Sequence, residues 1–195
     1  GYGKRISVEV AADGSVTVED DGRGIPTGMH PEEHAPVLEI VFTRLHAGGK
    51  FAKADGSGPY TFAGGLHGVG VSVTNALSKH LVVTVWRDGQ EATMGFRDGF
   101  VSEPLEIKKS SRPKSRTGTR VTVWPDPKYF DSPVIPEPAL VRLLRSKAVL
   151  LPGCEVDYVN KITGTEAHWK YSGGLKEYLL SEIKGESLIE PFEAS

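Results

Sequence analysis

Residues 64–70 constrain the fold of this chain most, because four of the seven are glycine: Gly64-Gly65-Leu66-His67-Gly68-Val69-Gly70. Glycine loses more conformational freedom on folding than other residues, so such a run indicates a backbone that turns with positive φ or approaches a ligand closely. Residues 71–78 predict a short helix, whose N-terminal N–H groups favour an anion. The stretch therefore predicts a phosphate-binding loop, with a tight structural turn as the alternative.

The spacing of these glycines differs from the common phosphate-binding loops. Gly65 and Gly70 keep the G-x-x-x-x-G spacing of a Walker A loop, but Val71 stands where the lysine is required. The Rossmann order G-x-G-x-x-G is reversed here, and residues 70–74 lack the closing glycine of a nucleophile elbow. We expect His67 to contribute its backbone N–H and no acid–base chemistry.

A second stretch, Asp20-Asp21-Gly22-Arg23-Gly24-Ile25-Pro26, follows a predicted β-hairpin formed by residues 6–10 and 16–19. Two glycines after a strand-end carboxylate allow the backbone to turn away and leave Asp20 at the floor of a pocket. Burying a carboxylate is costly unless a hydrogen-bond donor meets it, and an adenine amino group is such a donor. A solvated Asp-Gly turn is the alternative interpretation.

These two stretches, together with Thr117-Gly118-Thr119, resemble the GHKL or Bergerat ATP-binding fold of gyrase B, heat-shock chaperones, histidine kinases and MutL. Residues 45–51, Leu-His-Ala-Gly-Gly-Lys-Phe, are similar to the ATPase domain of bacterial type II topoisomerases in particular. Residues 124–126, 130–133 and 147–150 resemble the topoisomerase IV B subunit (ParE) more than gyrase B. The alternatives are gyrase B, another GHKL ATPase such as a histidine-kinase or chaperone module, and a non-catalytic nucleotide-binding module.

The resemblance implies that Asp20 binds adenine and that the Thr119 hydroxyl holds a water between Asp20 and the base. It also implies that Lys50 contacts phosphate oxygens and that residues 52–60 belong to a lid over the nucleotide. The residues for which it implies nucleotide contact are Asp20, Arg23, Gly24, Ile25, Pro26, Val41, Lys50, Gly64, Gly65, Leu66, His67, Gly68, Val69, Gly70, Arg87 and Thr119.

In the resembled family, a Glu that activates water and an Asn that holds Mg²⁺ lie on a helix preceding the position that matches Gly1. We therefore expect residues 1–195 to be a single N-terminal ATP-binding domain truncated at its N-terminus, with no catalytic and no metal-binding residue. This fragment should bind ATP or ATP-competitive inhibitors as a monomer without hydrolysing ATP. The parent enzyme should use ATP and Mg²⁺ in the cytoplasm, together with DNA and a topoisomerase A subunit of the ParC or GyrA type.

The alternation of hairpins and helices predicts an α+β fold, a two-layer sandwich of a mixed or antiparallel sheet with helices on one face. Further hairpins are expected at 81–86 with 91–96 and at 155–160 with 165–171. Further helices are expected from Pro36 to Ala47-Gly48-Gly49, over 137–150 and over 175–183. The length suits one domain, and Cys154, the single cysteine, fits a reducing cytoplasm and a core position.

Two other patterns have less specific interpretations. His30 and His34 are spaced like zinc ligands, but Pro31 replaces the glutamate that a metalloprotease motif requires after its first histidine. Lys108 to Arg120 contains six basic and no acidic residues, which favours a solvated loop, with DNA contact as the alternative. The formal net charge of −2 gives the chain no global attraction to nucleic acid or membranes.

Overall fold

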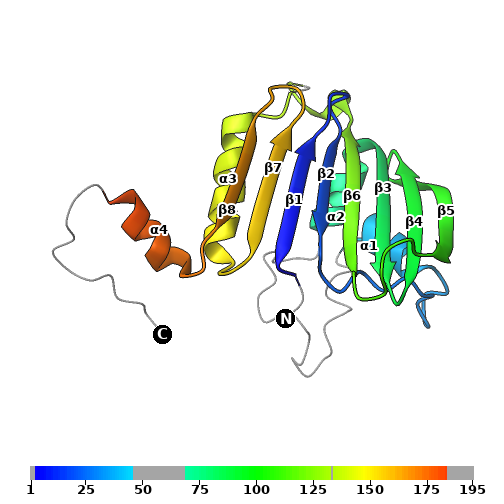
Figure 1. The fold of residues 1–195 in the computed structure, drawn as a ribbon. Helices are drawn as coiled ribbons and strands as arrows, with labels where there is room; N and C mark the ends of the chain where they lie inside the picture. The colour runs from blue at the N-terminus through cyan, green and yellow to red at the C-terminus, as the bar shows by residue number, and fades with distance from the viewer. Residues whose placement is uncertain (1–2, 46–68, 133, 184–195) are drawn as a thin grey trace.

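The computed structural model describes residues 3–45, 69–132 and 134–183. These residues form one eight-stranded sheet in the order β5-β4-β3-β6-β2-β1-β7-β8, with α1, α2 and α3 behind it in Figure 1. Neighbouring strands are antiparallel except β1 and β7, which are parallel, so the sheet is mixed. The predicted α+β class, with helices on one face of a mixed sheet, is confirmed.

The strands are β1 (Arg5–Val10), β2 (Val16–Asp20), β3 (Ser78–Arg87), β4 (Gln90–Arg97), β5 (Phe100–Lys109), β6 (Gly118–Pro125), β7 (Glu155–Asn160) and β8 (Glu166–Lys170). The helices are α1 (Val37–Thr43), α2 (Gly70–Ala76), α3 (Glu137–Leu150) and α4 (Gly174–Glu182), with a short 3₁₀ turn η2 (Pro127–Tyr129). No helix among the described residues is both long and apolar enough to cross a membrane.

All three predicted hairpins are present, and their turns explain why the local sequence predicts them. Asp88 and Gly89, which join β3 to β4, have φ values of 54° and 79°. Two positive φ values in a two-residue turn match the twist of the flanking strands, and Asp-Gly favours this geometry. The hairpins of β1 with β2 and of β7 with β8 have the predicted antiparallel pairing.

Strand β5 was not predicted, because its sequence lacks a clear alternation of apolar and polar side chains. It lies at the edge of the sheet, where most of its side chains are exposed and Pro104 is tolerated. Since β5 extends to Lys109 and β6 begins at Gly118, the basic run 108–120 is a loop only over residues 110–117. The prediction of a single solvated loop was therefore wrong at both ends.

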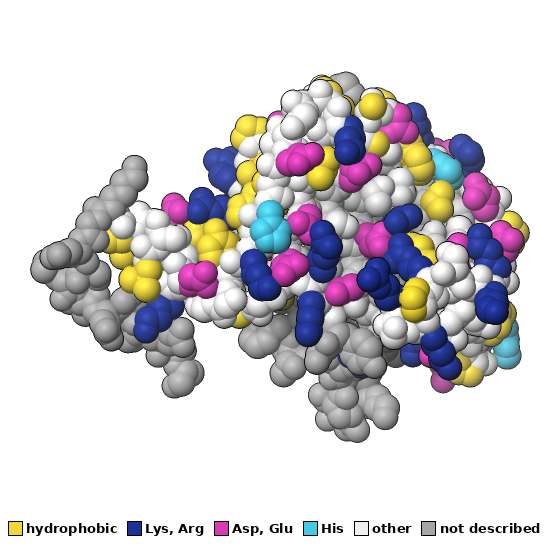
Figure 2. Space-filling view, in the orientation of Figure 1, with side chains coloured by type: hydrophobic (Ala, Val, Ile, Leu, Met, Phe, Trp, Pro, Cys, Tyr) yellow, Lys and Arg dark blue, Asp and Glu magenta, His cyan; other side chains and the backbone are white. Residues whose placement is uncertain are grey.

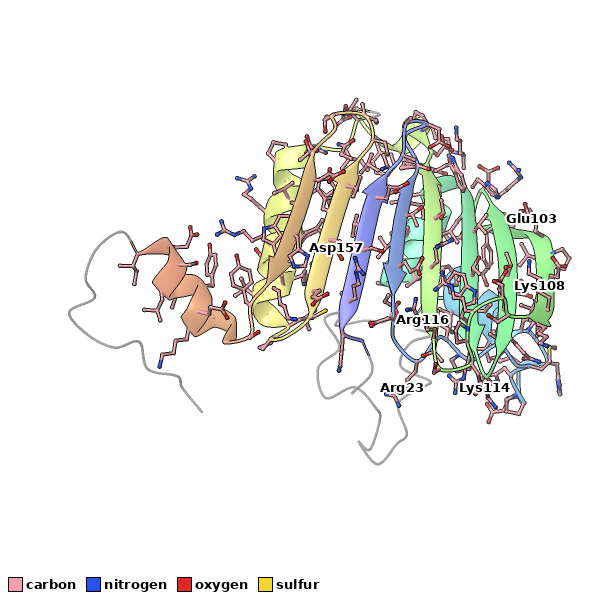
Figure 3. All side chains as sticks on the ribbon, viewed as in Figure 1. Arg23, Glu103, Lys108, Lys114, Arg116 and Asp157 are labelled. Atoms are coloured by element: carbon pink, nitrogen blue, oxygen red, sulfur yellow. The ribbon has the colours of Figure 1, made fainter. Side chains whose placement is uncertain are left out.

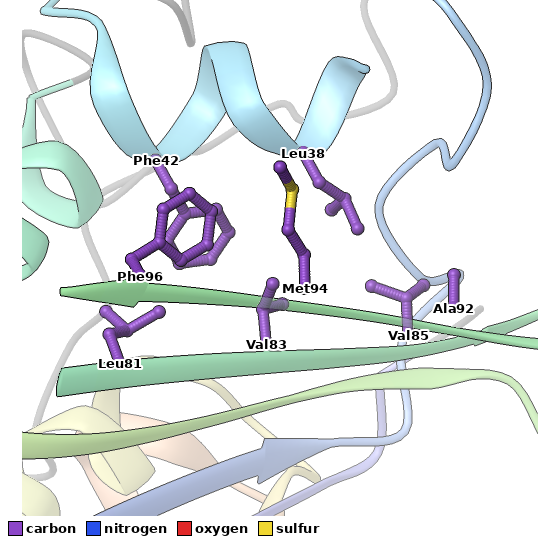
Figure 4. Packing of buried hydrophobic residues seen from close by; sticks show 8 residues of the cluster. All are labelled: Leu38, Phe42, Leu81, Val83, Val85, Ala92, Met94 and Phe96. Atoms are coloured by element: carbon purple, nitrogen blue, oxygen red, sulfur yellow. The ribbon is translucent and has the colours of Figure 1, made fainter. Parts of the chain in front are cut away.

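One hydrophobic core lies between α1 and strands β3 and β4 (Figure 4). Its fully buried members include Phe42 and Phe96, whose stacked rings have centroids 5.4 Å apart. The predicted end of α1 at Ala47-Gly48-Gly49 was wrong, because the helix ends at Thr43. Arg44 is extended, with φ −112° and ψ 137°, and its guanidinium pairs with Glu33.

A second core lies between α3 and the strands β1 and β7, and contains Val8, Val10, Leu144, Ala148, Val156 and Tyr158. Cys154, just before β7, is buried as predicted. The side chain of Glu137 at the start of α3 accepts hydrogen bonds from Tyr158 Oη at 3.0 Å and Asn160 Nδ2 at 2.8 Å. Apolar packing and these two hydrogen bonds together hold α3 against β7.

Candidate functional site

A cavity of about 1380 Å³ opens at the end of the sheet where β2 ends and β6 begins. Its size exceeds the roughly 300–1,000 Å³ of ordinary small-molecule pockets, so a ligand as large as a nucleotide fits. The cavity is lined by Gly3, Lys4, Ile6, Asp20, Gly22, Arg23, Gly24, Ile25, Phe42, Val71, Thr119, Val121, Leu150, Leu151, Pro152, Gly153, Cys154 and Lys170. Asp20 is the only carboxylate among these described lining residues.

Asp20 and Thr119 meet in this cavity because β2 and β6 are antiparallel neighbours with these two residues in register. The Asp20 carboxylate is half-buried, and its Oδ1 accepts a hydrogen bond from the Gly22 N–H at 2.8 Å. Burial raises the pKa of Asp20 above its ordinary value, while the backbone N–H groups of Gly22 and Thr119 act in the opposite direction. A carboxylate has about four acceptor positions, so a donor inside the cavity can be accommodated.

Gly24 allows the turn after Asp20 to pack closely against β3. Its φ is +74°, and a Cβ there would lie 2.9 Å from the Trp86 carbonyl oxygen and 3.0 Å from Val85 Cγ1. Gly118 makes an even closer approach, because a Cβ there would lie 2.2 Å from the Asp20 carbonyl oxygen. Both glycines are therefore required for backbone packing around Asp20, in addition to any approach of a ligand to Gly24.

Several other predicted residues lie around this turn, and they differ in whether they face the cavity. Arg23 and Ile25 line it, and Figure 3 shows Arg23 at the end of the sheet where the cavity opens. Pro26 is exposed and does not line the cavity. Val41 lies on α1, packs against the core between α1 and strands β3 and β4, and does not line the cavity either. Arg87 does not line the cavity either, since its Nη1 donates to the Gly24 carbonyl oxygen at 2.9 Å.

The predicted phosphate-binding loop is described only at its C-terminal end. Lys50, the lid residues 52–60 and residues Gly64 to Gly68 lie outside the described residues. Val69 and Gly70 lead into α2, which confirms the predicted helix, and Val71 in its first turn lines the cavity. The buried Asn75 holds α2 in place by donating from Nδ2 to the carbonyl oxygens of Phe42 at 2.9 Å and Gly99 at 3.1 Å.

Two sets of residues at this site were missed by the sequence interpretation. Thr117, at the start of the motif that ends in Thr119, donates from Oγ1 to the Gly22 carbonyl oxygen at 2.6 Å and so braces the Asp20 turn. The far wall of the cavity is formed by residues 150–154 and by Lys4, which are distant from the motifs in sequence. No local pattern marks these residues, because only the parallel pairing of β1 with β7 brings them to the cavity.

The two histidines with zinc-like spacing serve a local turn. His30 Nδ1 accepts hydrogen bonds from the backbone N–H groups of Glu32 and Glu33, at 3.3 and 3.2 Å. Within the described ranges, no group of three or more His, Cys, Asp or Glu side chains is placed to hold a metal ion. The zinc interpretation therefore finds no support in this part of the chain.

Comparisons with known proteins point in the same direction as this geometry. A family model described as "Histidine kinase-, DNA gyrase B-, and HSP90-like ATPase" matches residues 1–129. The chain is 45% identical over 185 residues to the B subunit of DNA topoisomerase 4 from Escherichia coli, and 46% identical over 183 residues to that from Pseudomonas aeruginosa. It is 42% identical over 195 residues to the B subunit of DNA gyrase from Thermus thermophilus. These alignments cover 94–98% of this chain but only 28–30% of the relatives.

Two solved structures share the fold. The 43K ATPase domain of Thermus thermophilus gyrase B, in complex with an aminocoumarin, superposes with a TM-score of 0.79 at 36% identity, covering 97% of this chain and 46% of that one. The topoisomerase IV ATP-binding domain of Francisella tularensis, in complex with a small-molecule inhibitor, gives a TM-score of 0.78 at 35% identity, covering 100% and 51%. With the family model matching well over half of its residues, the chain belongs to the histidine kinase-, DNA gyrase B- and HSP90-like ATPase family.

Proposed function

We propose that this chain is the ATP-binding domain of the B subunit of a bacterial type II topoisomerase, of the topoisomerase IV type in preference to the gyrase type. We further propose that the cavity at the end of β2 and β6 binds the adenine nucleotide. The observation that carries the proposal is the Asp20–Thr119 pair, which brings a half-buried carboxylate and a 7% exposed hydroxyl residue to one cavity.

The purine end of the ligand is assigned to Asp20 because a half-buried carboxylate gains a charge-assisted hydrogen bond when an N–H donor meets it. An adenine amino group that donates to Asp20 restores a hydrogen bond lost on burial, which offsets the desolvation that raises the pKa of Asp20. The Thr119 hydroxyl is beside it and can hold a bridging water. Ile25 and Val121 line the same cavity with apolar surface suited to the faces of the base.

The phosphate end is assigned to the glycine-rich run 64–70, which precedes α2 in the sequence. Val71, in the first turn of α2, borders the cavity that contains Asp20, so a nucleotide with its base on Asp20 can extend toward that run. Backbone N–H groups at such a position favour phosphate oxygens. The proposed contacts of Lys50 and of residues 64–68 rest on the sequence resemblance.

Hydrolysis of ATP requires a group that orients water and a Mg²⁺ ion that neutralises charge developing on the phosphates. Asp20 is the only carboxylate among the described residues that line the cavity, and we assign it to the purine. For the described part of the chain we therefore propose nucleotide or inhibitor binding without turnover. In the parent enzyme we propose ATP-driven DNA strand passage in the cytoplasm, with Mg²⁺, DNA and a topoisomerase A subunit.

Calorimetric titration with ADP tests the site, using Asp20→Asn against Asp21→Asn as a matched control. Asp21 accepts from the backbone N–H groups of Lys4 at 2.7 Å and Arg5 at 2.8 Å, and it does not line the cavity. Loss of a charge-assisted hydrogen bond, about 1.5–3 kcal/mol, predicts roughly 10- to 100-fold weaker binding for Asp20→Asn. Equal ADP affinity in wild type and Asp20→Asn would contradict the assignment.

A second assay addresses turnover. We expect no steady-state phosphate release from this chain, and release that depends on protein concentration and is abolished by Asp20→Asn would refute binding without hydrolysis. The choice between topoisomerase IV and gyrase needs the full-length parent protein together with its A subunit. Decatenation and relaxation without negative supercoiling are the results expected for the topoisomerase IV type.

A further inference from the structure

The loop that joins β5 to β6, residues 110–117, contacts two neighbouring parts of the chain. Arg112 pairs with Glu19 on β2, and Thr117 bonds Gly22 in the turn after Asp20. Glu19 and Asp20 are consecutive on β2, so their side chains point to opposite faces of the sheet. Asp20 lines the cavity, whereas Glu19 pairs with cations on the other face. Figure 2 shows Lys and Arg side chains interspersed with Asp and Glu over the visible face of the sheet.

Arg112 anchors the middle of this loop through two contacts. Its guanidinium carbon lies 3.4 Å from the centroid of the Trp86 ring, and its Nη1 lies 2.9 Å from Glu19 Oε1. The side chains of Arg112 and Glu19 are only 28% and 22% exposed, so solvent screens this pair less than a surface pair. Burial raises the pKa of Glu19, but hydrogen bonds from Arg112 and Arg120 outweigh it and hold the pKa below its ordinary value.

Thr117 anchors the end of the loop on the nucleotide side. Its hydroxyl donates to the Gly22 carbonyl oxygen at 2.6 Å, and the Gly22 N–H donates in turn to Asp20 Oδ1 at 2.8 Å. A Cβ on Gly22 would lie 2.6 Å from the same Oδ1 atom, so the Gly22 backbone is packed directly against the carboxylate. A continuous series of contacts therefore joins the 110–117 loop to the group assigned to the purine.

We infer that Arg112 is a positioning residue of the nucleotide site: by holding the 110–117 loop on Trp86 and Glu19, it fixes the Thr117–Gly22 contact that orients Asp20. The inference rests on the proposed nucleotide site. Arg112 does not line this cavity, but it lines a neighbouring hollow of about 600 Å³ that also includes Asp20 and Thr117. The role assigned to Arg112 is to hold the loop, with no contact to the ligand. Its effect falls on the purine end of the site.

This role predicts a loss of base discrimination. A correctly oriented Asp20 accepts from the adenine amino group, whereas guanine presents a carbonyl oxygen at the corresponding position and is rejected. When Asp20 is misoriented, the affinity for ADP falls while the affinity for GDP, which gains nothing from Asp20, stays the same. A general loss of fold stability lowers the affinities for ADP and GDP by the same factor. The ratio of the two dissociation constants therefore separates a positioning role of Arg112 from a purely structural one.

The experiment measures ADP and GDP dissociation constants for wild type, Arg112→Ala, Arg112→Lys and Lys114→Ala. Lys114 is a cation of the same loop that makes no ion pair or side-chain hydrogen bond within the part of the chain that the structure describes. Figure 3 shows it below the ends of the strands, and its side chain lies near Gly89 in the β3–β4 turn. Arg112→Ala should weaken ADP binding about tenfold, within the range seen for residues that act through packed networks. Arg112→Lys keeps the charge near Glu19 but loses the planar stack, so its effect should be intermediate.

Three results would overturn the inference: unchanged ADP affinity in Arg112→Ala, equal losses for ADP and GDP, or the same loss in Lys114→Ala. If Arg112→Ala does not fold, Arg112→Lys is judged by the same ratio. Failure of the proposed function looks different. In that case wild type shows no ADP binding at all, whereas failure of this inference alone leaves wild-type binding and its dependence on Asp20 intact.

Discussion

Replacing Gly24 by alanine tests whether the close packing of the Asp20 turn on β3 is needed for both stability and binding. The new Cβ would lie 2.9 Å from the Trp86 carbonyl oxygen, where contacts of at least 3.4 Å are ordinary. The turn must therefore retreat from β3 by several tenths of an ångström, since the backbone of β3 is fixed by pairing with β4 and β6. The left-handed φ of +74° adds about 1–2 kcal/mol of strain, and the overlap about 1–3 kcal/mol.

Gly14→Ala is the matched control for Gly24→Ala. Gly14 has a similar φ of +80°, but a Cβ there would meet no heavy atom within 4 Å, so only the backbone strain applies. Urea unfolding should show a loss of about 1–2 kcal/mol for Gly14→Ala and about 2–5 kcal/mol for Gly24→Ala. ADP affinity should fall about tenfold in Gly24→Ala alone, because small displacements of binding groups are costly. Equal destabilisation of the two variants, or wild-type affinity in Gly24→Ala, would refute the reasoning.

Two further predictions concern the core and the acid response. Phe42→Ala removes a fully buried ring and should cost about 3–5 kcal/mol in urea unfolding, whereas Phe100→Ala, at a 77% exposed edge position, should stay within about 0.5 kcal/mol of wild type. Hydrogen bonds from the Ser15 side chain and backbone and from Trp124 lower the pKa of Asp13 to about 2, so its stabilising contribution is present above its ordinary pKa of 3.8 and is lost as the pH falls toward 2. Trp124→Phe should raise the pKa of Asp13 in an NMR titration and move this loss to higher pH, and an unchanged titration would contradict the assigned cause.

Elements with strong local signals were predictable from the sequence. Helix α3 occupies the predicted range 137–150, because proline and apolar spacing mark its ends, and the β3–β4 hairpin follows from its Asp-Gly turn. Strand β5 was not predictable in this way, since an exposed edge strand needs no regular apolar face. The end of α1 was missed because Arg44 leaves the helix to pair with Glu33, a tertiary contact without a local signal.

The candidate site shows the same division between local and long-range information. The resemblance predicts nucleotide contacts for Asp20 and Thr119, and the pairing of β2 with β6 brings these two residues side by side. The bracing roles of Arg87 and Thr117 were not predictable, because their partners are backbone carbonyls 63 and 95 residues away in the chain. Any donor side chain can bond a carbonyl oxygen, so residue types alone do not reveal such contacts.

The position of β1 in the sheet has a consequence for how the chain folds during synthesis. Among the strands that the structure describes, β1 leaves the ribosome first, but it lies between β2 and β7, so its edge toward β7 lacks its final partner until residues 155–160 have emerged. Strands β1 to β6 can associate earlier. At that stage the backbone N–H and C=O groups on the β7 side of β1, which carries Val8 and Val10, can pair with a strand of another chain. Pairing with β7 thus removes this edge of β1, and the outer edge of the described sheet then passes to β8, whose side chains are exposed or half-buried.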